Sequence, residues 1–128
     1  MKKEYCVEIA ELLKFCDYIH MSYYEYHDRL EKKSMPKILI GGEYLKIIIN
    51  GDVCSSLSLL KNRIKTFLIF FDSIRKNNVS TEKDKERCGS YVKKFNSMFD
   101  DVYEKIKCEK NVLLDKNSKN VVMMNYFI

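Results

Sequence analysis

The residues best suited to chemistry lie close together near the start of the chain: Cys16, His20 and His27. Their spacing places them along one face of a helix, where thiolate and imidazole ligands can converge on a metal ion. A zinc site needs three or four ligands, and the chain has neither an HExxH pattern nor a close pair of cysteines to complete the set. The sequence therefore predicts no metal site and no cofactor.

Other catalytic patterns are also missing from the sequence. Asp100 and Asp101 are a pair of carboxylates, but adjacent residues on a helix point apart and do not act on one substrate. Gly41, Gly42 and Gly51 stand outside the GxGxxG and GxxxxGK[ST] frameworks that bind phosphate groups. No cysteine or serine lies in a recognisable arrangement with a base. We therefore expect a protein that is not an enzyme.

The cysteines indicate the compartment. Their number is odd and no CxxC pair occurs, which is typical of reduced thiols that serve as small apolar core residues. Charged sequence directly follows Met1, and the longest apolar run, residues 66–71, is far shorter than the roughly 20 residues of a membrane span. We expect a cytoplasmic protein without membrane contact. The five cysteines are Cys6, Cys16, Cys54, Cys88 and Cys108.

Aromatic residues are the strongest candidates for a binding surface. Four tyrosines lie close together in the first predicted helix, around more than one of its sides, and two further aromatic residues lie in the apolar tail. Exposed tyrosines are common interface anchors because they join a large apolar ring to a hydroxyl group. The alternative is that most of the rings are buried with only the hydroxyl at the surface. The predicted partner-binding residues are Tyr18, Tyr23, Tyr24, Tyr26, Tyr126 and Phe127.

A second candidate surface is basic. The net charge is +5, and the excess of lysine and arginine lies after residue 33, although acidic residues are interleaved with it. Such interleaving is more typical of a solvated helix surface than of a surface that follows phosphates. Nucleic-acid binding is therefore the alternative function, and its predicted contacts are Lys61, Arg63, Lys65, Arg75 and Lys76.

Three long helices must position these residues. Apolar residues recur at alternating steps of three and four over residues 3–33, over residues 53–74 with Asp52 as the N-cap, and over a stretch from Ser80 or Thr81 to residue 106. Pro36 ends the first of these helices. The first helix has a wide apolar face, so we expect it to be central.

Residues 37–49 have a different pattern. The pair Gly41-Gly42 suits the positive φ angles of a tight hairpin, and the β-branched run of residues 47–49 favours strand, so we predict two antiparallel strands. The alternative is a short helix interrupted at the glycines, which would make the protein all-α. The apolar tail, residues 120–128, is predicted as a third strand or as a contact with another chain.

Two short segments are similar to parts of small viral Bcl-2-like immune modulators, which are single helical domains of comparable size. These segments are residues 17–19, Asp-Tyr-Ile, and residues 51–54, Gly-Asp-Val-Cys. The predicted hairpin and the small number of helices depart from that all-helical pattern. No functional residue is carried over from this family.

The sequence as a whole predicts one compact, helix-rich domain over residues 1–128, with an α+β fold in which three long helices pack on a small antiparallel sheet. The predicted function is protein binding by a regulatory, inhibitory or immunity-type factor, or by a subunit of a larger assembly. A homodimer formed through the tail or the second helix is a further expectation.

Overall fold

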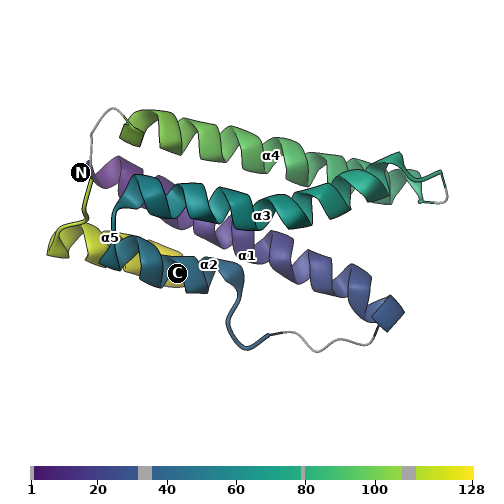
Figure 1. Ribbon diagram of the computed structural model, residues 1–128, viewed down its shortest axis with the longest axis horizontal. Helices are drawn as coiled ribbons and strands as arrows, with labels where there is room; N and C mark the ends of the chain where they lie inside the picture. Colours follow the sequence, from purple (N-terminus) through teal and green to yellow (C-terminus); the bar gives the residue numbers. More distant parts are fainter. Residues whose placement is uncertain (1, 32–35, 79, 108–111) are drawn as a thin grey trace.

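The computed structural model describes residues 2–31, 36–78, 80–107 and 112–128, with the side chains of residues 26–31 excepted. Figure 1 shows α1 running along the middle of the molecule, with α4 on one side and α2 and α5 on the other. Side chains from every one of these helices enter one hydrophobic core. Within the described ranges there are five helices and no strand: α1 (Lys3–Glu31), α2 (Ile40–Asn50), α3 (Val53–Lys76), α4 (Glu82–Lys107) and α5 (Lys116–Phe127).

The central position predicted for the first helix is confirmed. α1 packs against each of the other four helices, and its apolar stripe is buried in the core. Cys6 and Cys16 are fully buried in this stripe, as expected for cysteines that act as small apolar residues. A helix with such a wide buried face can serve as a scaffold on which the other helices lie.

The two long helices α3 and α4 also lie where the apolar spacing predicted. They pack along each other and bury Ile64, Phe71 and Phe95 completely. Asp52 caps α3 as predicted, because its Oδ1 accepts a hydrogen bond of 2.8 Å from the backbone N–H of Ser55. The hydroxyl of Thr81 accepts from the N–H of Asp84 in the same way before α4.

The predicted hairpin over residues 37–49, and with it the α+β fold class, is wrong. α2 runs through both glycines without interruption, so the protein is all-helical in its described ranges. A Cβ on Gly41 would lie only 2.3 Å from the backbone carbonyl oxygen of Leu13 in α1. Gly41 therefore permits two helices to approach each other closely. A tight turn also favours glycine, so the residue type alone does not distinguish the two roles.

The predicted C-terminal strand is also wrong, because residues 116–127 form helix α5. Asp115 is its N-cap and accepts a 2.7 Å hydrogen bond from the N–H of Ser118. α5 packs against α1 of the same chain and buries Val122 there. The tail thus docks within its own molecule. In the described part of the chain, no helix is both long and apolar enough to cross a membrane.

Candidate functional site

Asp17, a half-buried carboxylate, joins three helices. Its Oδ1 accepts a 2.7 Å hydrogen bond from the backbone N–H of Gly41 in α2, and its Oδ2 accepts from the hydroxyl of Tyr126 in α5. Burial raises the pKa of the Asp17 carboxyl, although these hydrogen bonds act against the shift. Burial and the bond to Asp17 also raise the pKa of Tyr126 well above its usual value. Asp17 therefore fixes both α2 and α5 on α1.

His20 makes a second bond between α1 and the start of α2. Its Nδ1 accepts a 3.0 Å hydrogen bond from the N–H of Ile40, and its ring packs against Phe67 at a centroid distance of 4.9 Å. Burial lowers the pKa of His20, and the nearby Arg63 lowers it further. Leu39 is the N-cap of α2 and has no side-chain cap bond, so side chains of another helix bind the first N–H groups of α2.

A groove of about 430 Å³ lies above Asp17, between α2 and α5. Asp17 of α1 contributes to its floor. Residues of α2 and α5 form its two walls, and the segment before α2 adds to the lining. The lining residues are Asp17, Lys37, Ile38, Leu39, Gly42, Leu45, Lys46, Ile49, Met123, Tyr126 and Phe127.

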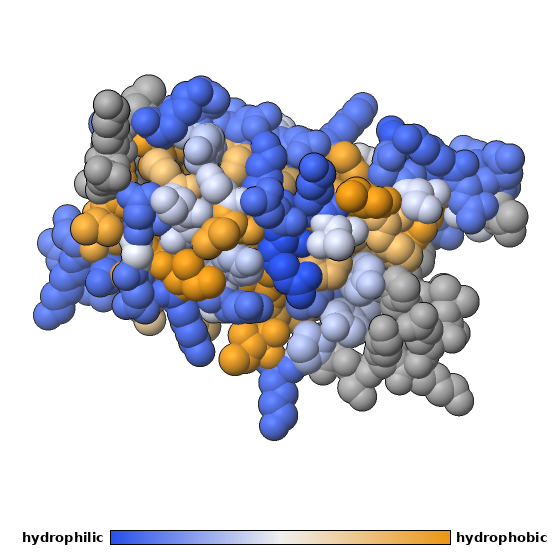
Figure 2. All heavy atoms as spheres, in the orientation of Figure 1, coloured by the Kyte–Doolittle hydropathy of each residue, from blue (hydrophilic) through white to orange (hydrophobic). Residues whose placement is uncertain are grey.

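Several of the apolar side chains at this groove are strongly exposed. The exposed fraction is 54% for Ile38, 38% for Met123 and 72% for Phe127. Figure 2 shows apolar residues over α2 and the segment that leads into it, whereas the end of the molecule where α3 leads to α4 is mostly hydrophilic. Contiguous apolar surface of this kind usually marks a contact with a ligand or another protein.

Of the five predicted partner-binding residues whose side chains the structure describes, only Tyr126 and Phe127 line this groove. Tyr18 is 47% exposed but lies against Tyr91 of α4, with ring centroids 5.6 Å apart. Tyr23 is half-buried and packs its ring edge-to-face on Phe67 of α3.

Tyr24 is also half-buried, and its ring contacts those of His20 and Tyr23. The side chain of Tyr26 lies outside the described residues. Tyr18 thus packs toward α4, whereas Tyr23 packs toward α3 and contacts Tyr24, so these three tyrosines do not form one surface.

The five predicted nucleic-acid contacts are also spread out. Lys61 lies over the ring of Phe99 in α4, and Arg63 lies over the ring of Phe67. Lys65 is exposed on α3, one turn after Lys61. Lys61 and Lys65 therefore share one side of α3, whereas Arg63 lies on the opposite side.

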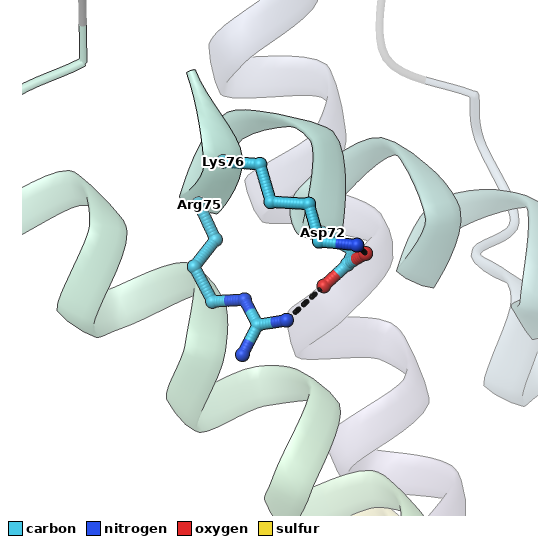
Figure 3. A network of polar contacts seen from close by, with 3 residues as sticks. All are labelled: Asp72, Arg75 and Lys76. Carbon is cyan, nitrogen blue, oxygen red and sulfur yellow. Dashed lines mark hydrogen bonds and ion pairs between the residues drawn. The ribbon is translucent and has the colours of Figure 1, made fainter. Parts of the chain in front are cut away.

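The last two predicted contacts, Arg75 and Lys76, bind an acidic neighbour. Arg75 Nη2 is 2.6 Å from one carboxylate oxygen of Asp72, and Lys76 Nζ is 2.9 Å from the other (Figure 3). These contacts lower the pKa of Asp72. Asp72 offsets part of the positive charge that a phosphate would meet here.

A basic concavity that sequence reasoning missed lies beside Arg75. It has a volume of about 650 Å³ between the end of α3 and the first half of α4. Most of its residues come from successive turns of α4. The i, i+4 spacing of lysines and serines in the sequence indicates that these side chains share one face of the helix. The lining residues are Arg75, Lys85, Glu86, Gly89, Ser90, Lys93, Lys94 and Ser97.

The residues considered for metal binding and acid-base chemistry have other roles. Cys16 is buried and His20 bonds to α2, while the side chain of His27 lies outside the described residues. Over the described ranges, no three His, Cys, Asp or Glu side chains converge as metal ligands do. Asp100 and Asp101 are both exposed on α4.

Comparison with known proteins finds no match among family models, curated proteins or solved structures. The predicted hairpin was one of two features in which the sequence differed from the viral Bcl-2-like modulators, and the described structure has a helix there instead. The resemblance still rests on two short segments alone. In this structure Asp17 of the first segment binds α2 and α5, and Asp52 of the second caps α3.

Proposed function

We propose that this chain is a non-enzymatic protein-binding factor that takes its partner into the groove between α2 and α5. It would act as a regulatory, inhibitory or immunity-type protein in the cytoplasm, or as a subunit of a larger assembly. The observation that carries the proposal is the exposure of Ile38, Met123 and Phe127 around an apolar groove. Burying such residues releases water from apolar surface and supplies affinity.

The polar groups of the groove support binding rather than catalysis. Both carboxylate oxygens of Asp17 already accept hydrogen bonds from groups of the protein, and the hydroxyl of Tyr126 donates to Asp17. A general acid or base must instead have a proton-transfer position facing the substrate. These groups are therefore better suited to fixing the shape of the groove.

Nucleic-acid binding is the second candidate, and the basic concavity favours it over the residues predicted from the sequence. Arg75, Lys85, Lys93 and Lys94 line the concavity together with two serine hydroxyls. Phosphate contacts made there would weaken steeply with salt, whereas binding in the mainly apolar groove would weaken far less. The salt dependence of binding therefore separates the two functions.

Gly42 offers a direct test of the groove. It lines the groove on α2, and a Cβ there would lie at ordinary contact distance, 3.4 Å, from Ile38 and Tyr126. The variant Gly42→Phe places a ring in the groove, and Gly42→Ala is the matched control that leaves it open.

Wild type and both variants are exposed in parallel to a displayed library of random peptides. The proposal predicts peptides that are captured by wild type and by Gly42→Ala but not by Gly42→Phe. If every captured peptide binds all three proteins equally, the groove is not the binding site. Capture of nucleic acid that is lost in high salt would favour the basic concavity.

A further inference from the structure

We propose that the groove between α2 and α5 receives an amphipathic helix of a partner protein, with apolar residues over about two turns and acidic residues beside them. This inference rests on the proposed function, because it names the partner of the same groove. Three features of the groove lead to it: the geometry of its walls, the backbone that forms them, and the charges at its rim.

The walls have the spacing of helices. Gly42, Leu45 and Ile49 line one wall at steps of three and four, and Met123 and Phe127 line the other at a step of four. Gly42 and Ile49 are seven positions apart on α2, which corresponds to about 10 Å along the helix axis. A third helix lying between two such ridges would meet them with apolar residues over about two turns.

The backbone of the walls excludes a partner that binds as an extended strand. Both walls are α-helices, whose N–H and C=O groups bond within the helix along its length, and the first N–H groups of α2 bond to His20 and Asp17. The only β-bridge in the described ranges, Asp52 to Leu113, is isolated and lies outside the groove lining. An extended partner would lose hydration of its backbone without receiving hydrogen bonds, whereas a helix satisfies its own backbone groups.

The rim of the groove carries positive charge. Lys37 and Lys46 line it, and neither forms an ion pair with another residue in the described part of the chain. Lys119 lies one turn before Met123 on α5 and adds to the same side. The one acidic lining residue, Asp17, already accepts hydrogen bonds from Gly41 and Tyr126. Acidic residues on the partner therefore complement this rim.

The same charges argue against a second copy of this chain as the occupant. In a two-fold dimer each surface faces itself, so an interface centred on this groove would bring Lys37 and Lys46 of both copies together. Like charges placed opposite one another oppose association. A partner with acidic residues meets no such repulsion.

The test is a selection of displayed peptides on the full chain, with Gly42→Ala and Gly42→Phe treated in parallel. We expect groove-dependent peptides to share apolar residues at i, i+3 or i+4, and i+7, with Asp or Glu on the flanks. The strongest peptide is then synthesised, and its circular dichroism is expected to show helix formation on binding.

A charge-reversed protein, Lys37→Glu with Lys46→Glu, supplies the second measurement. Its affinity for the acidic peptide is expected to fall by about tenfold or more, since two rim attractions become repulsions. A version of the peptide with Lys at the flanking positions is expected to recover binding to this variant. Both substitutions are at exposed positions, so folding is retained.

The outcomes separate the inference from the proposed function. Groove-dependent peptides that are extended, or that have no acidic preference, would overturn the helical acidic partner and leave the groove as a binding site. If no captured peptide depends on the groove, the proposed function itself fails. A dimer in light scattering that Gly42→Phe disrupts would replace the acidic partner by a second copy.

Discussion

Replacing Gly41 by alanine is expected to destabilise the fold by about 2 kcal/mol. The new Cβ would lie 2.3 Å from the carbonyl oxygen of Leu13 and 2.6 Å from Oδ1 of Asp17, so α2 must move away from α1. Overpacking of this kind costs about 1–3 kcal/mol, and the strained hydrogen bond to Asp17 adds about 1 kcal/mol. The higher helix propensity of alanine returns about 1 kcal/mol.

The assay is urea and thermal unfolding of Gly41→Ala beside Gly42→Ala. For a chain of 128 residues, a loss of about 2 kcal/mol lowers Tm by roughly 6–10 °C. The Cβ of Gly42→Ala meets Ile38 and Tyr126 only at ordinary contact distance, 3.4 Å, so this variant is expected to be neutral or up to about 1 kcal/mol more stable than wild type. Equal loss of stability in both variants would refute the helical packing, because a hairpin turn would need both glycines.

Three further predictions concern bonds and packing, all measured by urea unfolding. Tyr126→Phe removes the hydrogen bond to Asp17 and is expected to cost about 1–2 kcal/mol; an unchanged unfolding midpoint would contradict the role of that bond. The pKa of His20 is lowered in the folded state, so the unfolded chain binds a proton first as pH falls, and stability is lost from about pH 6.5 downward. His20→Asn keeps an acceptor for Ile40 and should flatten this pH dependence, whereas an unchanged slope would assign it to other groups. Phe95→Ala empties a fully buried site and is expected to cost about 3–5 kcal/mol; a loss below about 1 kcal/mol would show that the core does not depend on this ring.

The three long helices could be predicted from the sequence, because their apolar stripes continue over many turns and each is bounded by a local signal. Asp52 and Thr81 cap α3 and α4 as their positions before the apolar runs predicted. In these segments local preference and tertiary packing agree, so periodicity alone is informative.

The sequence was not sufficient for α2. Its β-branched residues favour strand, and its stabilising partners, His20 and Asp17, lie 20 and 24 residues before the groups that they bind. Gly41 has the same identity whether it forms a turn or lies against another helix. Only the packing of α2 on α1 distinguishes these two roles.

The error at the tail had a signal that could have been used. Asp115 is a favoured N-cap residue that can mark a helix start, and in the structure it accepts a hydrogen bond from the backbone N–H of Ser118. Tyr126 and Phe127 were predicted as binding residues and do line the groove. The opposite wall was missed because it belongs to α2, whose residues were assigned to a hairpin.

We propose that the groove between α2 and α5 binds a protein partner, and the affinity for a groove-dependent peptide is the direct readout of that binding. Isothermal titration compares the binding of the strongest selected peptide to wild type, Gly42→Ala and Gly42→Phe. We predict equal affinity for the first two and a loss of at least about thirtyfold for Gly42→Phe, because its ring displaces an apolar anchor. Equal affinity of all three folded proteins for the peptide would contradict the claim.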